Sequence, residues 1–323
     1  MTSIKFSLVI PNLNGAKLLS PCLKSLLFAL KKVPHLKFEI ILIDNASTDN
    51  SVSLFTLKTK KLINLLKIEN CKLKILQNSR NLGVSPAIRQ GIAAAQYPYV
   101  IPCNNDIKFH PQWFSHIVKA IQTNHDPLLI TFFGTILNKT GDRIESTGFN
   151  FNYSGKCTHL NHNKKFRPNI KNSREVWGAS AALVVYHTST VKKIGSFDPD
   201  FFAYEEDVDL ALRLHNLGYK TLWVPPALSY HLGGATSSKM GNFRYRHDAK
   251  NWIYVIIKNY SLRQIIQNFP GIVEQRLRNL SGLLKNTPFI LWLPTLISVY
   301  GQVIIKLPAM LTKRRQIIKQ SFF

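Results

Sequence analysis

The first hundred residues alternate between short apolar runs and longer amphipathic segments. Runs rich in β-branched and aromatic residues predict four strands, at Phe6–Ile10, Phe38–Ile43, Leu73–Gln77 and Tyr97–Ile101. Apolar residues at helical spacing predict helices between them, at Leu18–Leu30, Val52–Leu66 and Ser85–Gln96. Such alternation is typical of βαβ units, so we expect an α/β fold with a mostly parallel, Rossmann-like sheet flanked by helices.

Each of the predicted strands ends in a polar cluster rich in Asn, Asp, Ser or Gly. The clusters are Pro11–Gly15, Asp44–Asp49, Asn78–Gly83 and Asn104–Asp106. In open α/β sheets, ligands bind beyond the carboxyl ends of the strands. Turn chemistry alone explains any one cluster, but four in succession predict a shared binding rim.

The cluster with the most specific chemistry is Asn104-Asn105-Asp106. A carboxylate among side-chain amides at a strand end suits a hard divalent cation that keeps some waters and meets substrate phosphates. The alternative is an Asx-rich turn that only ends the strand. A helix is expected soon afterwards, since His110, Pro111 and Trp113 resemble a helix start.

The second half of the chain is less regular. We expect short strands and loops over residues 130–176, and a buried strand or helix at Val176–Tyr186. A helix is predicted at Val208–Leu217, where Gly218 is a suitable terminator. A further strand, Leu222–Val224, precedes Pro225 and Pro226, and His231 lies beyond it.

Composition adds a charge argument. The 323 residues carry a formal net charge of +25, which predicts an anionic partner such as nucleic acid, a lipid surface or a phosphorylated substrate. The four scattered cysteines lack C-x-x-C spacing and fit reduced core residues of a cytosolic protein. Met1–Phe6 leads straight into a strand, so no signal peptide is expected.

The chain changes character near Asn242, and we predict two regions, residues 1–241 and 242–323. Residues 239–323 hold 14 Lys and Arg but only two acids. Phe289–Leu307 approaches the roughly 20 residues needed to span a bilayer, but its prolines predict a poor uninterrupted helix. We therefore expect a basic amphipathic tail that lies in the membrane interface through Trp252, Phe289 and Trp292.

Five motifs in order resemble the family 2 glycosyltransferases. They are Pro11–Gly15, Asp44–Asp49, Asn81-Leu82-Gly83, Asn104-Asn105-Asp106, and Glu205–Leu210 with His231. The similarity covers residues 6–235 and is greatest to the rhamnosyltransferase-like branch, which carries an Asn-Asn-Asp version of the Asp-x-Asp motif. It implies a GT-A fold, a nucleotide-sugar donor (a dTDP- or UDP-sugar) and a divalent metal, Mg²⁺ or Mn²⁺.

The resemblance also assigns roles to residues on the rim. Asp106 would hold the metal on the donor diphosphate, with His231 completing the site; the alternative for His231 is a satisfied loop histidine. Asp44 would hydrogen-bond the pyrimidine base. The donor-binding residues would be Pro11, Asn12, Asn14, Asp44, Asn81, Gly83 and Asn105.

Four acids crowd a predicted helix start: Glu205, Glu206, Asp207 and Asp209. Helix N-termini favour acids for dipole reasons, but four exceed what a cap needs, and their repulsion raises proton affinity. By the resemblance, Asp207 is the general base. Glu206, Trp177 and Gly178 would face the acceptor, although Trp177 could equally be a core residue.

These observations predict an inverting, metal-dependent glycosyltransferase of cell-surface polysaccharide synthesis. Its acceptor would be a glycan or a polyprenyl-diphosphate-linked sugar, and the protein would be cytoplasmic and peripheral on the inner face of the cell membrane, bound to anionic lipid. One alternative is a metal-dependent nucleotidyltransferase, although Pro11–Gly15 is not a Gly-rich phosphate loop. The other is a basic lipid- or nucleic-acid-binding protein without catalysis; no nucleic-acid recognition motif is present.

Overall fold

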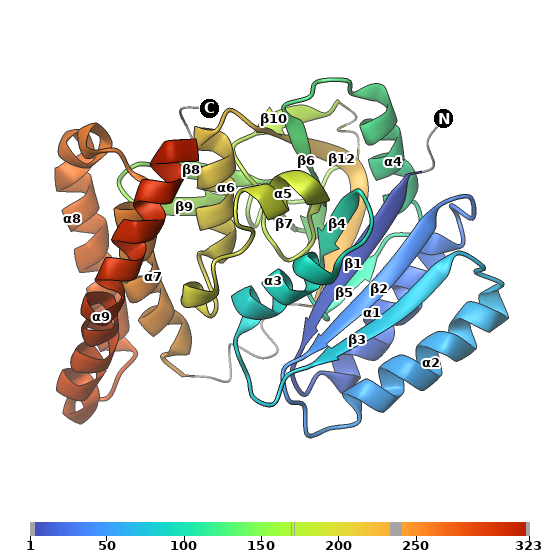
Figure 1. The fold of residues 1–323 in the computed structure, drawn as a ribbon, viewed down its shortest axis with the longest axis horizontal. Coiled ribbons are helices and arrows are strands. Elements are labelled where there is room, and N and C mark those ends of the chain that lie inside the picture. Colours follow the sequence, from blue (N-terminus) through green and yellow to red (C-terminus); the bar gives the residue numbers. More distant parts are fainter. Residues whose placement is uncertain (1–3, 169, 171, 233–240, 321–323) are drawn as a thin grey trace.

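The computed structural model describes residues 4–168, 170, 172–232 and 241–320 (Figure 1). Its centre is a ten-stranded mixed sheet whose main path is β10-β12-β6-β11-β4-β1-β2-β3, with β5 paired to β12 and β7 to β6. The strands that carry the predicted rim are parallel: β1 (Lys5–Asn12), β2 (Lys37–Asp44), β3 (Cys71–Gln77) and β4 (Tyr99–Pro102). The predicted mostly parallel α/β sheet is therefore confirmed.

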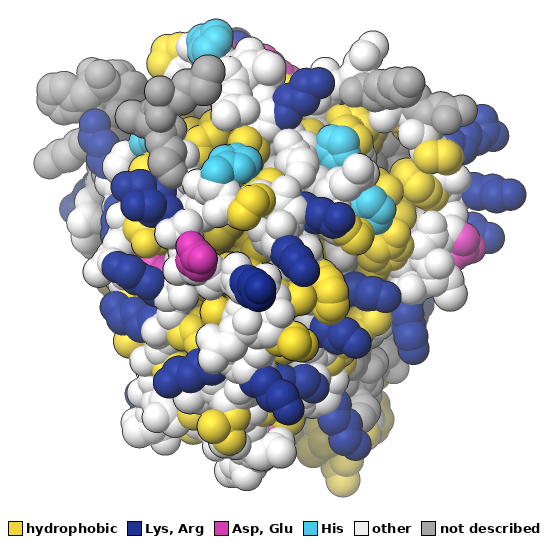
Figure 2. Space-filling model, turned by 90° about the vertical axis from the view of Figure 1, so that its right-hand side faces the viewer, with side chains coloured by type: hydrophobic (Ala, Val, Ile, Leu, Met, Phe, Trp, Pro, Cys, Tyr) yellow, Lys and Arg dark blue, Asp and Glu magenta, His cyan; other side chains and the backbone are white. Residues whose placement is uncertain are grey.

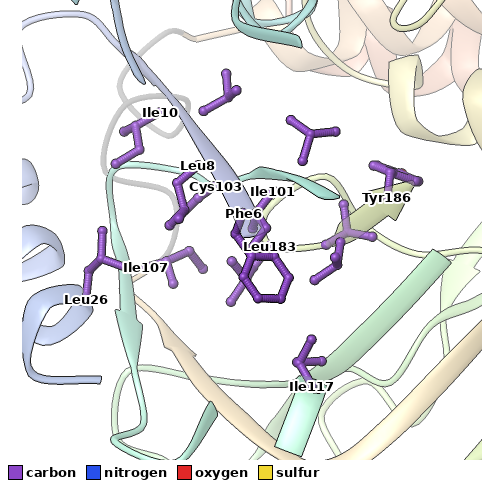
Figure 3. Close-up of a cluster of buried hydrophobic side chains, with 14 of the residues drawn as sticks. Phe6, Leu8, Ile10, Leu26, Ile101, Cys103, Ile107, Ile117, Leu183 and Tyr186 are labelled. Atoms are coloured by element: carbon purple, nitrogen blue, oxygen red, sulfur yellow. The ribbon is translucent and has the colours of Figure 1, made fainter. Parts of the chain in front are cut away.

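The core strands are apolar on both faces because helices cover both faces of the sheet. Phe6, Leu8 and Ile10 of β1 pack with Ile101 and with Leu183 in one continuous cluster (Figure 3). Helices α3 (Val84–Ala94) and α5 (Thr188–Lys193) lie in front of the sheet in Figure 1. Behind it lie α1 (Ala16–Leu30), α2 (Ser51–Leu66) and α4 (Trp113–Thr123).

Residues 130–176 are more ordered than the pattern predicts. They include the nine-residue β6 (Leu129–Leu137), which lies in the middle of the sheet and is buried along almost its whole length. A strand buried on both faces lacks the polar alternation by which a half-buried strand is recognised. The short strands are β7 (Ile144–Ser146), β8 (Phe149–Asn152), β9 (Lys156–His159) and β10 (Arg174–Val176).

The strand expected at Leu222–Val224 is also longer than predicted. It is β12 (Lys220–His231), which runs parallel to β6 and continues past Pro225 and Pro226. The register shifts between Trp223 and Leu228, and this irregularity accommodates the two prolines, which have no amide proton to give to the ladder. His231 is thus the last residue of a strand and not part of a loop; it pairs with Ile107 of β5 (Ile107–Phe109).

The element expected at Val176–Tyr186 is only partly regular. Val176 is the last residue of β10 and Val185 begins β11 (Val185–His187); the residues between them are mostly buried without forming a helix. Their backbone groups bond one by one to neighbouring segments: Asn104 donates its N–H to the carbonyl of Ala182. The apolar composition therefore reflects burial of an irregular segment, which periodicity alone does not distinguish from a strand.

Helices make up the C-terminal region. After α6 (Glu206–Asn216) and β12 come α7 (Phe243–Asn259), α8 (Leu262–Lys285) and α9 (Trp292–Gln320). A short 3₁₀ turn, η3 (Phe289–Leu291), precedes α9, and another, η1 (Pro199–Phe201), precedes α6. The expectation that prolines interrupt the last apolar stretch is wrong. Pro294 falls in the first turn of α9, where no intrahelical amide bond is lost, and the helix continues through Pro308.

Trp252 was expected in the membrane interface, and the structure corrects this. Its side chain is 5% exposed and packs in a second core cluster with Phe149 and Val255. Helix α7 thus contributes to the core beside α6, while the boundary predicted near residue 241 stays a prediction. Basic side chains also cover the opposite face of the molecule (Figure 2), so the positive charge is not confined to the C-terminal helices.

Candidate functional site

Side chains from three neighbouring strand ends form one hydrogen-bonded network at the predicted rim. The Nδ2 atom of Asn12 donates to Ser47 Oγ at 3.2 Å and lies 3.4 Å from Asp44 Oδ1. Asn105 Nδ2 donates to Asn12 Oδ1 at 2.9 Å. A Cβ atom at Gly15 would collide with the side chains of Asn12 and Asn105, so glycine permits this approach. Pro11 directly precedes the network on β1.

The second loop of the rim is shaped by Asn14 and Asp44. Asn14 Oδ1 accepts the backbone N–H groups of Thr48 at 2.7 Å and Asp49 at 3.3 Å. Asp44 Oδ2 accepts the N–H of Ser47 at 3.1 Å. The two side chains therefore hold residues 47–49 against the end of β1, and both were predicted donor-binding residues.

The third loop is joined to the second through amides. Asn45 Nδ2 donates to the carbonyl of Gly83 at 3.0 Å, and Asn78 Nδ2 donates to Asn45 Oδ1 at 2.8 Å. Asn81 Oδ1 accepts the N–H of Gly83 at 2.9 Å, in a local Asx turn. Gly83 has φ of +95°, and a Cβ atom there would collide with Phe202.

Asp106 lies beside His231, at the point where β5 begins and β12 ends. The distance between Asp106 Oδ1 and His231 Nε2 is 3.0 Å, and His231 Nδ1 lies 2.6 Å from Glu145 Oε1 on β7. Although burial lowers it, the adjacent carboxylates of Asp106 and Glu145 raise the pKa of His231 to about 10. The imidazole is therefore fixed between two carboxylates.

This donor set fits a divalent cation held in part by its substrate. Carboxylate oxygen suits Mg²⁺ or Mn²⁺, and a carboxylate on the second ring nitrogen is the usual partner of a metal-binding histidine. Among the described residues no group of three or more His, Cys, Asp or Glu has metal-binding geometry. Asp106 and His231 would therefore share the ion with phosphate oxygens and water. A cation would compete with the Nε2 proton, because only neutral imidazole ligates a metal.

Asp207 lies in the first turn of α6, close to the Asn104–Asp106 motif. Its Oδ2 accepts the N–H of Ala181 at 3.1 Å, and the carbonyl of the next residue, Ala182, accepts the N–H of Asn104 at 2.9 Å. Burial raises the pKa of Asp207, and the Ala181 hydrogen bond limits that rise. A partly exposed carboxylate of raised basicity has the properties of a general base.

Glu206 and Asp209 differ sharply from Asp207. Glu206 is buried, its Oε2 has no hydrogen-bond partner among the described residues, and burial beside Asp207 raises its pKa to about 8. Asp209 is fully buried and accepts hydrogen bonds from Arg213 at 2.8 Å and Lys258 at 2.8 Å. Those two cations lower the pKa of Asp209 despite its burial. Its carboxylate is therefore committed to structural ion pairs.

The ion pairs of Asp209 extend to the segment that precedes α6. Lys258 of α7 also binds Asp198 at 2.6 Å, and Lys313 of α9 binds Asp198 at 2.5 Å. Asn251 donates its side-chain amide to the carbonyls of Phe201, Ala203 and Tyr204. Helices α7 and α9 thus fix the loop that carries the clustered acids.

Of the predicted acceptor residues, Trp177 packs against the second core cluster, and Gly178 follows it in the chain. The ring of Trp177 stacks on Phe151, with centroids 4.1 Å apart and 5° between the planes, and His215 lies 5.5 Å away. A Cβ atom at Gly178 would meet Ala211 of α6. One face of Trp177 is thus occupied, and its contact with an acceptor stays a prediction.

Two family models match the chain. The glycosyl transferase family 2 model covers residues 7–195, which include the rim and the Asn104–Asp106 motif. The chain belongs to glycosyl transferase family 2. The model for glycosyl transferase family group 2 matches residues 114–312, a range that includes the clustered acids and most of the C-terminal helices.

Two curated relatives share part of the sequence of this family 2 chain. It is 26% identical over 238 residues to a poly-beta-1,6-N-acetyl-D-glucosamine synthase of Staphylococcus aureus; this covers 72% of the chain but only 52% of the relative. A dodecaprenyl-phosphate galacturonate synthase of Rhizobium johnstonii is 26% identical over 128 residues, which are 40% of the chain and 36% of the relative. The chain thus spans about half the length of the curated relatives it first matches.

Solved structures with the same fold have low sequence identity. TarS of S. aureus matches with a TM-score of 0.56 at 17% identity over 98% of the chain and 54% of TarS. TarS 1-349 in complex with UDP-GlcNAc has a TM-score of 0.54 at 15% identity over 97% and 92%. The mannosyltransferase PcManGT of Pyrobaculum calidifontis, in complex with GDP-Man and Mn²⁺, has a TM-score of 0.52 at 12% identity over 100% and 87%. These neighbours confirm the GT-A-like fold.

Sequence reasoning missed three participants in the site. Glu145 lies in a stretch without clear periodicity, so nothing indicated that it meets His231. Asn45 was within a quoted motif, but its bond to Gly83 depends on two loops meeting in space. Phe202 was within a stretch rich in aromatic residues, Phe201–Tyr204, and only its positive φ of 63° and its contact with Gly83 reveal its role as a wall of the site.

Proposed function

We propose that this family 2 protein is an inverting, metal-dependent glycosyltransferase. It moves a sugar from a nucleotide-diphosphate donor to a hydroxyl of a glycan or a polyprenyl-diphosphate-linked acceptor. The observation that carries the proposal is the bridge made by residues 181–182, since Ala181 donates to Asp207 and Ala182 accepts from Asn104. A base and a metal-binding motif connected in this way can act on two sides of one sugar.

The proposed chemistry divides between two places. When bound, the divalent cation at Asp106 and His231 supplies positive charge that stabilises the departing nucleoside diphosphate. Asp207 takes the proton of the acceptor hydroxyl as that oxygen attacks the anomeric carbon from the face opposite the leaving group. Attack from the opposite face inverts the anomeric configuration.

The donor is proposed by class. The structural neighbours include TarS with UDP-GlcNAc and GalNAc-T7 with UDP, GalNAc and Mn²⁺, which supports a UDP-sugar and a divalent metal here. The resemblance to the rhamnosyltransferase-like branch supports dTDP-rhamnose instead. The deciding experiment is a donor screen that measures nucleotide release with Mg²⁺, with Mn²⁺ and with neither. Release from none of the donors with either metal would refute the proposed function.

Asp44→Ala is expected to weaken binding of the donor nucleotide by about 1–3 kcal/mol, measured by calorimetry, because a buried polar contact to the base is lost. The control is Asp126→Ala, which removes an acid paired with Lys220 at the opposite end of the sheet. If nucleotide affinity is unchanged and only the melting temperature falls, Asp44 serves the loop at Ser47 and does not contact the base.

We further propose that the protein lies on the membrane through α9 without crossing it. The stretch Phe289–Ile318 is long and apolar enough to span a bilayer. Among its exposed apolar residues, however, one set recurs at every seventh position and shares a face, although Leu293, Ile305 and Leu307 are exposed as well. The set is Ile290, Ile297, Ile304, Leu311 and Ile318. The other face is bound to the protein, since Lys306 pairs with Asp200 at 2.8 Å and Lys313 pairs with Asp198.

Helix α8 offers a second apolar stripe of the same kind. Leu262, Ile266, Phe269, Val273 and Leu277 are exposed and follow helical spacing. Helices α8 and α9 both lie at the edge of the molecule away from the sheet (Figure 1). Apolar faces bordered by basic residues are typical of helices that insert into the headgroup region of anionic membranes.

Replacing Ile297 and Ile304 together by Glu is expected to weaken binding to anionic vesicles roughly 10-fold or more, measured by co-sedimentation, because two apolar side chains no longer insert. The control is the double replacement of Leu57 and Leu65 by Glu, which changes equally exposed leucines on α2. Wild-type protein should be released from membranes by carbonate and should not bind DNA. A requirement for detergent would favour a spanning helix, and salt-sensitive DNA binding would favour a nucleic-acid partner.

A further inference from the structure

A pocket of about 360 Å³ lies where α7, α9 and the segment before α6 meet. None of its lining residues belongs to the polar clusters of the rim, although Phe202 also contacts Gly83. Its lining combines aromatic, polar and basic side chains from all three segments: Phe202, Asn242, Phe243, Arg246, His247, Lys250, Val299 and Gln302. Every charged lining residue is a cation, so the pocket has the electrostatic character of an anion site.

Neither Arg246 nor Lys250 has a carboxylate partner within the part of the chain that the structure describes. Lys250 is 6% exposed, and its ammonium group donates to the neutral Gln302 Oε1 at 3.2 Å. Arg246 donates to the neutral Ser298 Oγ at 2.8 Å. By contrast, Lys258 on the same helix binds two carboxylates, at 2.6 and 2.8 Å.

All 17 Asp and Glu of the chain lie in the part that the structure describes, so no acidic side chain outside that part pairs with these cations. Asp200 is the acid that acts electrostatically on Lys250, but its carboxylate is already bound by Lys306 and Lys313. A buried charge without a compensating partner is costly in free energy. An anionic ligand would remove that cost.

Two further polar features converge on the pocket. The Nδ1 atom of His247 is buried and has no hydrogen-bond partner among the described residues. The N-cap residue of α7, Asn242, turns its amide to Thr287 and does not cap the helix. Asn242 therefore supplies no side-chain acceptor to the first amides of α7, which lie at the positive end of the helix dipole.

The walls connect the pocket to the site and to α9. Phe202 stacks on His247, with centroids 5.5 Å apart and 15° between the planes, and also contacts Gly83 of the rim. On the other side, Val299 and Gln302 belong to α9, whose outer face is apolar and exposed. A ligand here would be near the clustered acids and beside the helix proposed to meet lipid.

We propose that this pocket binds a diphosphate group through Arg246, Lys250 and the N-terminus of α7. Two sources could supply it, the lipid carrier of the acceptor or the donor nucleotide. The position against α9 favours the lipid carrier, and that choice of source rests on the proposed function. Diphosphate binding itself does not.

The test is calorimetry of the full chain with geranyl diphosphate, inorganic pyrophosphate and UDP as probes. Arg246→Gln and Lys250→Met are expected to weaken geranyl diphosphate and pyrophosphate binding roughly 10-fold or more each, since each removes a charged hydrogen-bond donor. Arg244→Gln is the matched control, because it removes one charge from the same helix at an exposed position paired with Asp248. Without ligand, Lys250→Met should melt no lower than wild type.

The outcomes separate the alternatives. Weaker geranyl diphosphate binding with unchanged UDP binding assigns the pocket to the lipid carrier, and weaker UDP binding alone assigns it to the donor. Equal binding of all probes by Arg246→Gln, Lys250→Met and wild type would overturn the pocket, as would an equal loss in Arg244→Gln. Sugar transfer is not measured, so failure of the transferase proposal would leave this result standing, and the reverse holds too.

Discussion

Asp207→Asn is expected to lower turnover by roughly 10²–10⁴-fold, the usual contribution of a general base, while donor affinity is retained. The substitution keeps the shape of the side chain and removes its basicity. Steady-state kinetics with a saturating donor, together with calorimetric binding of the nucleotide, measure the two effects separately. Because burial raises the pKa of Asp207, wild-type turnover should fall on acidification at a pH above the ordinary range of an aspartic acid.

Two neighbouring acids serve as controls for Asp207. Glu206→Gln removes a carboxyl that burial keeps mostly protonated at neutral pH, so turnover there should change far less. Asp209→Asn breaks the pairs with Arg213 and Lys258, so it should lower the melting temperature by leaving buried cations unpaired. If Asp207→Asn turns over normally and Glu206→Gln does not, the base is Glu206 and the assignment of Asp207 is wrong.

Asp106→Ala is expected to abolish transfer, by at least about 10³-fold, with the fold intact. The proposed cation stabilises the charge that develops on the leaving diphosphate by several kcal/mol, and each 1.4 kcal/mol corresponds to a tenfold change in rate. Nucleotide release from the active donor measures the rate, and circular dichroism measures folding. Wild-type protein in EDTA should lose activity to the same extent and regain it with Mn²⁺ or Mg²⁺.

The matched control for Asp106 is Asp142→Ala, which removes an exposed acid from the turn between β6 and β7. It should leave both rate and metal dependence unchanged. Full activity of Asp106→Ala, or of the wild-type protein in EDTA, would contradict the metal site. A loss of activity that accompanies unfolding would be a structural effect, which is why the folding measurement belongs to the same experiment.

The strand ends show how far local pattern reaches. The rim positions of Asn12, Asp44 and Asp106 can be predicted because each comes just after an apolar run that forms a strand. Parallel pairing of those strands then brings their ends to one edge of the sheet. Asp209 could likewise be separated from Asp207 by the geometry of a helix, since two positions correspond to about 200° of rotation. These predictions depend only on short-range spacing.

Contacts between distant segments could not be predicted from short-range spacing. Glu145 meets His231 across 86 residues, and Lys313 meets Asp198 across 115 residues. The residues around each member of these pairs do not indicate its partner, because a single sequence does not show which distant side chains meet in the folded chain. Trp252 was placed in the membrane for the same reason: its amphipathic surroundings were visible, but the core that buries it was not.

The sequence by itself determined the alternating α/β order, the polar rim and the motifs of a family 2 glycosyltransferase, because these depend on periodicity and on residue types at fixed spacing. Only the tertiary structure decided that His231 is held between Asp106 and Glu145, that Asp209 is structural, and that α9 is bound along one face through Lys306 and Lys313. Each of these depends on burial and on partners from remote segments. Burial and remote partners determine the free energy of a charged side chain, and local sequence does not predict either of them.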